Sequence, residues 1–241
     1  MKSHKRFAFL VLLAAIAVMT YAGAQLFEAE QVYQEGNAAY EDLNDRVNKS
    51  PADTAERKID FVELKAISRD AVAWLYSPGT VIDYPVMKAN DYSYYLRRLP
   101  DGTSNANGSL FIDYNCAPDF SDPLTVIYGH NMKSGRMFGS LTGYRAQSYY
   151  DKHPTMFLYT EQGDYRIELL YGFVIGAGQW RERAFMYPEN VQALLAYAAH
   201  NTTFVSSAQY EADDRIAALS TCSYEFDDAR YVVIGRLRKA A

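Results

Sequence analysis

Cysteine and histidine are scarce in this sequence, which has two cysteines and four histidines among 241 residues. The two cysteines, Cys116 and Cys222, exclude a scaffold held together by several disulfides. Neither they nor the scattered histidines show a spacing that is typical of zinc sites. We therefore predict no metal ion and no cofactor, and we interpret Cys116 as a free thiol without a role.

The chain also lacks a stripe of lysine and arginine, an internal repeat and a low-complexity tract. Its net charge of −5 and the missing basic stripe give no support to a nucleic-acid partner. The hydrophobic content of 49% and the charged content of 22% are ordinary for a globular chain with a core. The length predicts one folded domain with additional segments.

An apolar N-terminal run is the longest uncharged stretch. Residues 1–6 form a basic tail, and residues 7–24 form a run of 18 residues without a charge. Extension to residue 27 brings the run to the roughly 20 residues that a membrane-spanning helix needs. Basic residues before it and acidic residues after it predict a single-pass anchor in the cell membrane, with residues 1–6 in the cytoplasm and the folded domain outside. A cleaved signal peptide stays open as the alternative, because Ala22-Gly23-Ala24 has the form of a cleavage site.

Two helices are predicted before the main domain. Residues 28–59 read as a juxtamembrane helical segment with Tyr40, Leu43 and Val47 at helical spacing. Ser50-Pro51-Ala52-Asp53 is typical of a helix start, with serine at the cap and proline at the first position. The apolar stripe of this second helix consists of Phe61, Leu64 and Ile67.

Residues 60–241 are predicted to form the folded domain. From about residue 71, short apolar runs alternate with clusters of Asp, Asn, Gly and Pro, a pattern that indicates strands and turns. One helix near residues 189–201 interrupts the series. The fold class is therefore mainly β with flanking helices, a closed or nearly closed barrel. The predicted strands are residues 72–76, 81–87, 109–114, 124–128, 155–160, 164–176, 215–221 and 231–237.

Three chemically reactive side chains lie at the ends of predicted strands. Cys222 ends the strand 215–221, and Arg230 precedes the strand 231–237. If these strands pair antiparallel, Cys222 and Arg230 lie at the same rim of the sheet. His130 follows the strand 124–128, and it reaches that rim only if its strand runs parallel to 215–221, which the residues leave open.

The three residue types suit acyl transfer through a thioester. A cysteine thiolate is a strong nucleophile, and an imidazole can take its proton and later protonate a leaving amine. Attack on an amide carbonyl produces an oxyanion, which a fixed arginine can stabilise. We therefore interpret Cys222, His130 and Arg230 as a candidate catalytic set.

The segments around these residues resemble the sortase family. Leu219-Ser220-Thr221-Cys222 with Arg230, and Tyr128-Gly129-His130-Asn131-Met132 with Met137-Phe138, carry the resemblance. It covers about residues 60–239 and is closer to class B sortases than to the family at large. The features that fit class B are the two N-terminal helices, the helix near 191–200, and residues 82–86, 95–96 and 108–114.

The resemblance implies a closed eight-stranded sortase-type barrel and a cysteine transpeptidase. It implies Cys222 as the nucleophile, His130 as the acid and base, and Arg230 as the residue that holds the substrate backbone and the oxyanion. A sorting signal of a surface protein would be cleaved after threonine, giving a thioester on Cys222. An amine of a peptidoglycan precursor or another acceptor would then resolve that thioester.

Several polar neighbours are candidates for substrate binding. Ser220 and Thr221 match the small hydroxyl residues that the family has before its cysteine. The remaining candidates are Asn131, Ser223, Tyr224 and Glu225. One departure from the family is Asn90-Asp91, where an Asp-Asn pair is frequent, so no polar role is carried over to that position.

Other functions remain open from the residues alone. A cysteine endopeptidase would use the same groups with water as the acceptor, although the papain-type Cys-Gly-Ser-Cys-Trp block is absent. An L,D-transpeptidase is disfavoured because its Ser-His-Gly-Cys-x-x-Arg-like block is missing. In a non-catalytic surface module, Cys222 would be a core residue, His130 would shape a turn, and Arg230 would form a surface ion pair.

Overall fold

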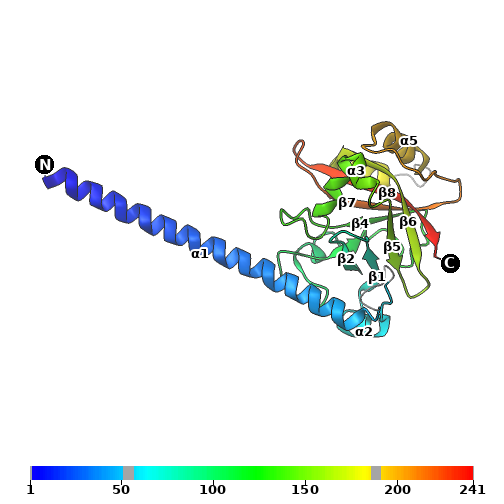
Figure 1. The fold of residues 1–241 in the computed structure, drawn as a ribbon, viewed down its shortest axis with the longest axis horizontal. Helices are drawn as coiled ribbons and strands as arrows, with labels where there is room; N and C mark the ends of the chain where they lie inside the picture. Colours follow the sequence, from blue (N-terminus) through cyan, green and yellow to red (C-terminus); the bar gives the residue numbers. More distant parts are fainter. Residues whose placement is uncertain (1, 51–56, 186–190, 241) are drawn as a thin grey trace.

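The chain forms a long N-terminal helix attached to a β-barrel, in a computed structural model that describes residues 2–50, 57–185 and 191–240. Helix α1 (Lys2–Val47) is one uninterrupted helix of 46 residues. Its N-terminal part projects away from the barrel, and its C-terminal part lies against it (Figure 1). Among the described residues, α1 is long and apolar enough to cross a membrane, with a mean hydropathy of 2.0 in its most apolar window.

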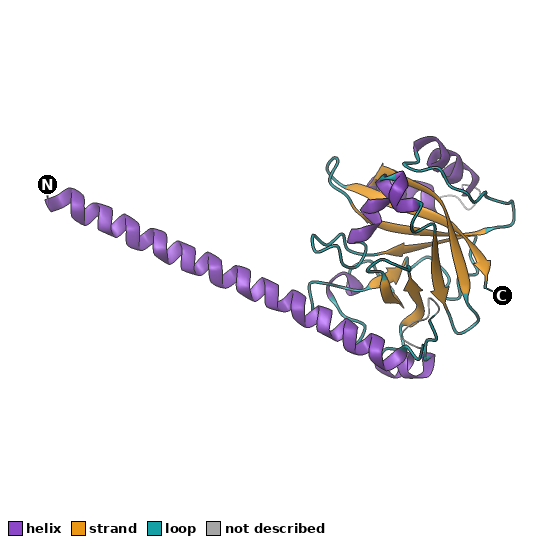
Figure 2. Ribbon diagram, viewed as in Figure 1, coloured by secondary structure: helices purple, strands orange, loops and turns teal. Residues whose placement is uncertain are grey.

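Eight strands close into a barrel in the order β1-β2-β3-β4-β7-β8-β6-β5. Figure 2 shows the strands in orange, with helices beside them. The pairs β2–β3 and β4–β7 are parallel and the other pairs are antiparallel. The predicted fold class, a closed eight-stranded barrel with flanking helices, is confirmed. The strands are β1 (Ala71–Tyr76), β2 (Asp83–Lys88), β3 (Leu110–Ile112), β4 (Leu124–Tyr128), β5 (Thr155–Tyr159), β6 (Tyr165–Gly176), β7 (Arg215–Cys222) and β8 (Ala229–Lys239).

Apolar side chains fill the barrel and also cover one outer face. The interior contains large, fully buried rings such as Trp74, Tyr144 and Tyr231. Helices α4 (Ala177–Phe185) and α5 (Val191–Asn201) share a second apolar cluster with β4, β6, β7 and β8. Strand β7 is therefore buried on both faces from Ile216 to Thr221, with Arg215 half-buried at its start and Cys222 exposed at its end.

The N-terminal helices differ partly from the prediction. Tyr40, Leu43 and Val47 are buried against the barrel, which agrees with their helical spacing. Helix α2 (Phe61–Ile67) begins at Phe61 and not near residue 50, because the Asp60 side chain accepts a hydrogen bond from the Glu63 amide and caps it there. Residues 51–56, where the prediction began this helix, lie outside the described residues.

Four short elements inside the domain were not predicted. They are the 3₁₀ helices η1 (Tyr94–Arg97) and η2 (Gly139–Arg145), helix α3 (Gln147–Tyr150) and helix α4. Each is too short for a clear helical period, so tertiary contacts decide its structure. Helix α5 agrees with the predicted helix near 189–201, of which residues 189–190 lie outside the described part of the chain.

Candidate active site

Strand pairing brings the three candidate catalytic residues to one rim of the barrel. Strand β4 runs parallel to β7, with Tyr128 opposite Ser220, so the chain leaves both strands at the same end. Strand β7 pairs antiparallel with β8, and Cys222 lies opposite Arg230. The parallel pairing is the arrangement that the residues alone left open, and it carries His130 to the rim that Cys222 and Arg230 share.

All three side chains line one groove of about 290 Å³. Cys222 is exposed and unpaired, so its sulfur can be reached from solvent. We call this the Cys222 groove. Ser220 and Thr221 also line it. Four aromatic residues form much of the remaining lining, Tyr92, Phe111, Tyr128 and Trp180, and Leu96 and Arg181 lie among them.

The imidazole of His130 is held by a backbone carbonyl. Its Nε2 atom lies 2.6 Å from the Leu96 oxygen. Because a carbonyl only accepts hydrogen bonds, Nε2 carries a hydrogen in either protonation state of the ring. Nδ1 is then the nitrogen that gains and loses a proton. Gly108 lies near the Cδ2 edge of the ring with a φ of +60°, and a Cβ at this position would approach His130 Cδ2 to 3.0 Å.

Two hydrogen bonds tie the segment after β4 to the end of β7. Asn131 Nδ2 donates to the Cys222 carbonyl at 2.7 Å, and Thr221 Oγ1 donates to the Gly129 carbonyl at 2.8 Å. Asn131 and Thr221, two of the residues predicted to bind substrate, therefore hold the backbone around the candidate catalytic set. The buried Ser220 hydroxyl has no hydrogen-bond partner within the described part of the chain.

The guanidinium of Arg230 has no acidic partner in the part of the chain that the structure describes. Its Nη1 donates to the Ala229 carbonyl at 3.0 Å, and no carboxylate of a described residue lies within ion-pair distance. A guanidinium that is not neutralised can receive an anion in the groove.

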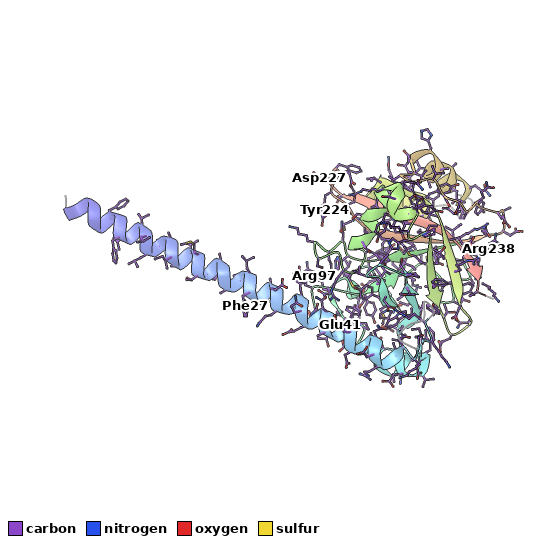
Figure 3. The ribbon with its side chains drawn as sticks, viewed as in Figure 1. Phe27, Glu41, Arg97, Tyr224, Asp227 and Arg238 are labelled. Carbon is purple, nitrogen blue, oxygen red and sulfur yellow. The ribbon has the colours of Figure 1, made fainter. Side chains whose placement is uncertain are left out.

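The other predicted binding residues, Ser223, Tyr224 and Glu225, lie beside the groove, on the connection from β7 to β8. Glu225 pairs with Arg145 and accepts a hydrogen bond from Ser223. Burial alone would raise the pKa of Glu225, but the Ser223 hydrogen bond and the nearby Arg145 lower it overall. Tyr224 is 75% exposed near the tip of the hairpin (Figure 3). Tyr224 and Glu225 line a neighbouring hollow and not the Cys222 groove.

The wall of the groove that Tyr92 and Arg181 form was not predicted from the sequence. The Arg181 guanidinium of α4 lies 5.3 Å from the centre of the Tyr92 ring, a cation–π contact that joins two distant segments. Tyr128 donates to the buried carboxylate of Asp113 at 3.0 Å, which fixes its ring at the groove. A lone aromatic residue in a loop carries no local signal of such a role, so Tyr92 and Arg181 could not be found from spacing.

Asp91, in the Asn90-Asp91 pair that departs from the family, holds the turn before helix η1. Asp91 Oδ1 accepts hydrogen bonds from the amides of Ser93 at 2.7 Å and Tyr94 at 2.8 Å. These bonds lower the pKa of Asp91 and fix the turn that precedes helix η1, whose N-cap is Ser93. Helix η1 contains Leu96, so Asp91 supports the carbonyl that holds His130.

Comparison with known proteins relates this chain to sortase B proteins. No protein-family model matches the sequence. Sortase B of Listeria monocytogenes is 30% identical over 185 residues, which cover 76% of this chain and 75% of the relative. Sortase B of Staphylococcus aureus is 24% identical over 241 residues and covers 98% of this chain and 99% of the relative.

Solved structures of sortase B proteins have the same fold. Bacillus anthracis sortase B in complex with AAEK1 superposes with a TM-score of 0.75 at 26% identity, over 87% of this chain and 99% of that chain. A sortase B complexed with triglycine gives a TM-score of 0.69 at 27% identity, over 75% of this chain and 86% of that chain. A substrate complex of Staphylococcus aureus sortase B, at 24% identity, has a TM-score of 0.75 over 86% of this chain and 98% of that chain. Because 30% of the residues are identical over three quarters of both chains and the barrel is the same, the chain belongs to the sortase B family of cysteine transpeptidases.

Proposed function

We propose that this transpeptidase cleaves a sorting signal in surface proteins and joins the released acyl group to an amine of a peptidoglycan precursor. The observation that carries the proposal is the Cys222 groove, which is lined by a thiol, an imidazole and a guanidinium that has no acidic partner among the described residues. Complexes of other sortase B proteins with a substrate and with triglycine support a peptide donor and a small amine acceptor.

In the first step, the Cys222 thiolate attacks the carbonyl carbon of the scissile peptide bond. A carbon–sulfur bond forms, the carbon–nitrogen bond breaks, and His130 gives its Nδ1 proton to the leaving amine. The Leu96 carbonyl keeps Nε2 protonated throughout, so the ring uses Nδ1 for this exchange. The product is a thioester on Cys222.

Arg230 stabilises the oxyanion that precedes bond cleavage. Its guanidinium stays protonated, faces the same groove as the sulfur and has no acidic partner among the described residues. A preorganised donor of this kind is worth about 3–4 kcal/mol of transition-state stabilisation. The Asn131 and Thr221 hydrogen bonds keep Cys222 and His130 at a fixed separation while the charge develops.

Helix α1 anchors the enzyme in the cell membrane through residues 7–27. Residues 1–6 carry the basic charges and lie in the cytoplasm, which puts the barrel outside the cell, where sorting signals and wall precursors meet. The described part of α1 is exposed along residues 9–27, as expected for a segment that contacts lipid.

A peptide library with a fluorophore and a quencher, offered to the full chain in detergent micelles, tests this function. We expect turnover of sorting-signal peptides, a Cys222 acyl adduct in intact-mass spectra, and an amide product when an amine is present. Cys222→Ala abolishes all three, and Cys116→Ala, the matched control, keeps them. Hydrolysed product alone, at every amine concentration, would identify an endopeptidase.

A further inference from the structure

The tip of the β7–β8 hairpin exposes two aromatic side chains that lie outside the core and outside the Cys222 groove. Tyr224 is 75% exposed and Phe226 is 51% exposed, the two highest values for aromatic residues in the described part of the chain from residue 60 onward. Neither side chain lines the Cys222 groove. Two exposed rings so close together on one hairpin form a small apolar surface, which we call the aromatic tip.

The aromatic tip is held by contacts with the barrel. The Ser223 amide donates to the Ala229 carbonyl at 2.9 Å and closes the hairpin. Glu225, between the two rings in the sequence, pairs with Arg145 at the end of η2. The exposed rings therefore have a fixed place relative to the barrel.

The burial of α1 shows where the barrel begins relative to the proposed membrane span. The described side chains of α1 are exposed from residue 9 to residue 35, and Gly36 is the first buried residue. With about 1.5 Å of rise per residue, Gly36 lies about 14 Å beyond Phe27, the last residue of the proposed span. The headgroup layer extends about 5–8 Å beyond each side of the hydrocarbon core. The barrel therefore docks onto α1 just outside this layer.

The aromatic tip lies on the side of the barrel that faces the span. Tyr224 lines a hollow of about 610 Å³ together with Glu30 and Tyr33 of α1. Glu30 and Tyr33 lie about 5 Å and about 9 Å beyond Phe27 along the helix, which is the level of the headgroup layer and its outer edge. In Figure 3, Tyr224 and Asp227 lie at the edge of the barrel toward the projecting part of α1.

The charge of the tip indicates what kind of contact it can make. Asp227 and Asp228 follow the rings, and Arg145 neutralises Glu225. The tip is therefore negative, and attraction to anionic lipids cannot hold it at a membrane. Aromatic rings need no such attraction, because their amphipathic side chains are favoured at the headgroup level of a bilayer. The surface thus fits a lipid interface that it enters through its rings.

We propose that Tyr224 and Phe226 rest in the headgroup layer of the membrane that α1 spans. This inference rests on the membrane anchor proposed above. The hairpin that carries the rings has Cys222 and Arg230 opposite each other at its base. Two contacts with one membrane, the span and the tip, leave the domain little freedom to swing about α1. The second contact therefore fixes the direction in which the Cys222 groove opens relative to the membrane surface.

Tryptophan fluorescence measures the depth of the tip. The chain has two tryptophans, Trp74 and Trp180, which are 0% and 2% exposed and give a constant background in the wild type. The full chain with Tyr224→Trp is inserted into phosphatidylcholine vesicles whose acyl chains carry bromine near the headgroup. We expect the added fluorescence to fall about twofold, as for an aromatic ring at the interface, and to fall less when the bromine lies near the chain end.

The matched control places the same probe at the other end of the domain. Val62, on α2, is 84% exposed. Its neighbour Glu63 pairs with Arg46, which lies about 28 Å beyond Phe27 along α1. Val62→Trp should therefore show no quenching with either lipid. High salt should leave the quenching of the Tyr224→Trp probe unchanged, because rings and not charges make the contact.

A second substitution tests the contribution of the native ring at position 226. In the Tyr224→Trp background, Phe226→Ser removes apolar surface from the tip and should weaken the quenching. Asp227→Ser, the matched control, removes a neighbouring charge and should keep the quenching at full strength. Both positions are exposed, so the barrel should stay folded in each variant.

Three results would overturn the inference: equal quenching of the Tyr224→Trp and Val62→Trp probes, loss of the quenching at high salt, or full quenching after Phe226→Ser. An anchor that fails would overturn it as well and is distinguishable, because the chain would then not float with the vesicles in a density gradient. Failure of the proposed transpeptidase reaction would leave the quenching unchanged, since the fluorescence measurement involves no turnover.

Discussion

The two ends of strand β8 hold arginines in opposite environments. Arg230, at the active-site rim, contacts only backbone carbonyls among the described residues. Arg236, at the other end, pairs with Glu168 at 2.8 Å, Glu211 at 3.0 Å and Asp214 at 3.5 Å, and its side chain is 14% exposed. Because a strand rises about 3.3 Å per residue, the two guanidinium groups belong to regions about 20 Å apart.

The two cysteines follow the same division. Cys222 is exposed at the rim. Cys116 is buried at the opposite end, where its sulfur donates to the carbonyl of Leu124, the first residue of β4. Burial raises the pKa of Cys116 to about 11. At one end of the barrel the arginine is paired and the cysteine is buried. At the active-site rim, Arg230 and Cys222 remain available to a substrate.

This contrast separates what stabilises the fold from what performs the chemistry. An arginine without an acid contributes little to folding, but it remains free for an anion that forms during reaction. A paired arginine contributes to stability and cannot serve a substrate in this way. Substitutions at the two ends should therefore affect different measurable quantities.

The largest expected difference is in thiol reactivity. A thiol with a pKa of about 11 has roughly 10²-fold less thiolate at neutral pH than an ordinary cysteine, and burial lowers access further. We expect a methanethiosulfonate to label Cys222 at least about 10²-fold faster than Cys116, measured by peptide mapping over time. In denaturant the labelling rates of Cys222 and Cys116 should become equal. Equal rates in the folded protein would contradict the difference between the two thiols.

The next difference is in turnover. Arg230→Ala should lower kcat/KM by about 10²–10³-fold, because the oxyanion loses its charged donor, with the midpoint of urea unfolding almost unchanged. Steady-state kinetics with a cleavable peptide measures the first quantity, and fluorescence in urea measures the second. Arg230→Lys keeps the charge but loses the planar donor set, so an intermediate rate is expected. A fully active Arg230→Ala enzyme would show that Arg230 takes no part in the reaction.

The converse substitution acts on stability. Arg236→Ala removes the arginine that Glu168 and Asp214 share in a largely buried site. Arg166 still pairs with Glu168 and Arg238 with Asp214, so the free energy of unfolding should fall by about 1–2 kcal/mol. Activity per folded molecule should stay within about twofold, because the site lies at the far end of β8. Urea titration and active-site counting by thiol labelling give the two values. A large loss of kcat with unchanged stability would show that the two ends are coupled.

The sequence contained much of this arrangement. Alternating apolar residues and turn clusters placed the strands to within a few residues, and the short link between 215–221 and 231–237 correctly predicted that Cys222 lies beside Arg230. The position of His130 could not be predicted in the same way. It depends on a parallel pairing between β4 and β7, which are separated by more than eighty residues and carry no local mark of register.

The wall of the Cys222 groove that contains Tyr92 and Arg181 could also not be predicted from the sequence. Helix α4 follows β6 directly, and glycines at positions 176 and 178 disfavour a helix start. The helix forms because Trp180 is buried near Phe173 at a ring distance of 6.5 Å. The contact between Arg181 and Tyr92 then depends on tertiary structure from two segments about ninety residues apart.

The smallest expected difference is in the response to acid. Burial alone would raise the pKa of Glu168, but the Arg236 hydrogen bond and the charges of Arg166 and Arg236 lower it below its ordinary range. As the pH falls below about 5, Glu168 binds a proton in the unfolded chain but stays ionised in the folded chain, so the free energy of unfolding decreases. One such carboxylate contributes a slope of at most about 1.4 kcal/mol per pH unit.

Glu168→Gln should flatten this slope between about pH 5 and pH 3, measured by urea unfolding at half-unit steps. Glu182→Gln, which changes an exposed acid on α4 at the other end of the barrel, should keep the wild-type slope. Stability at pH 7 should fall in the first variant only, since the Arg236 pairing is present above the ordinary carboxyl pKa and is lost as the pH falls through the lowered one. Superimposable curves for the three proteins would mean that the paired end of β8 contributes no more to folding than the unpaired rim.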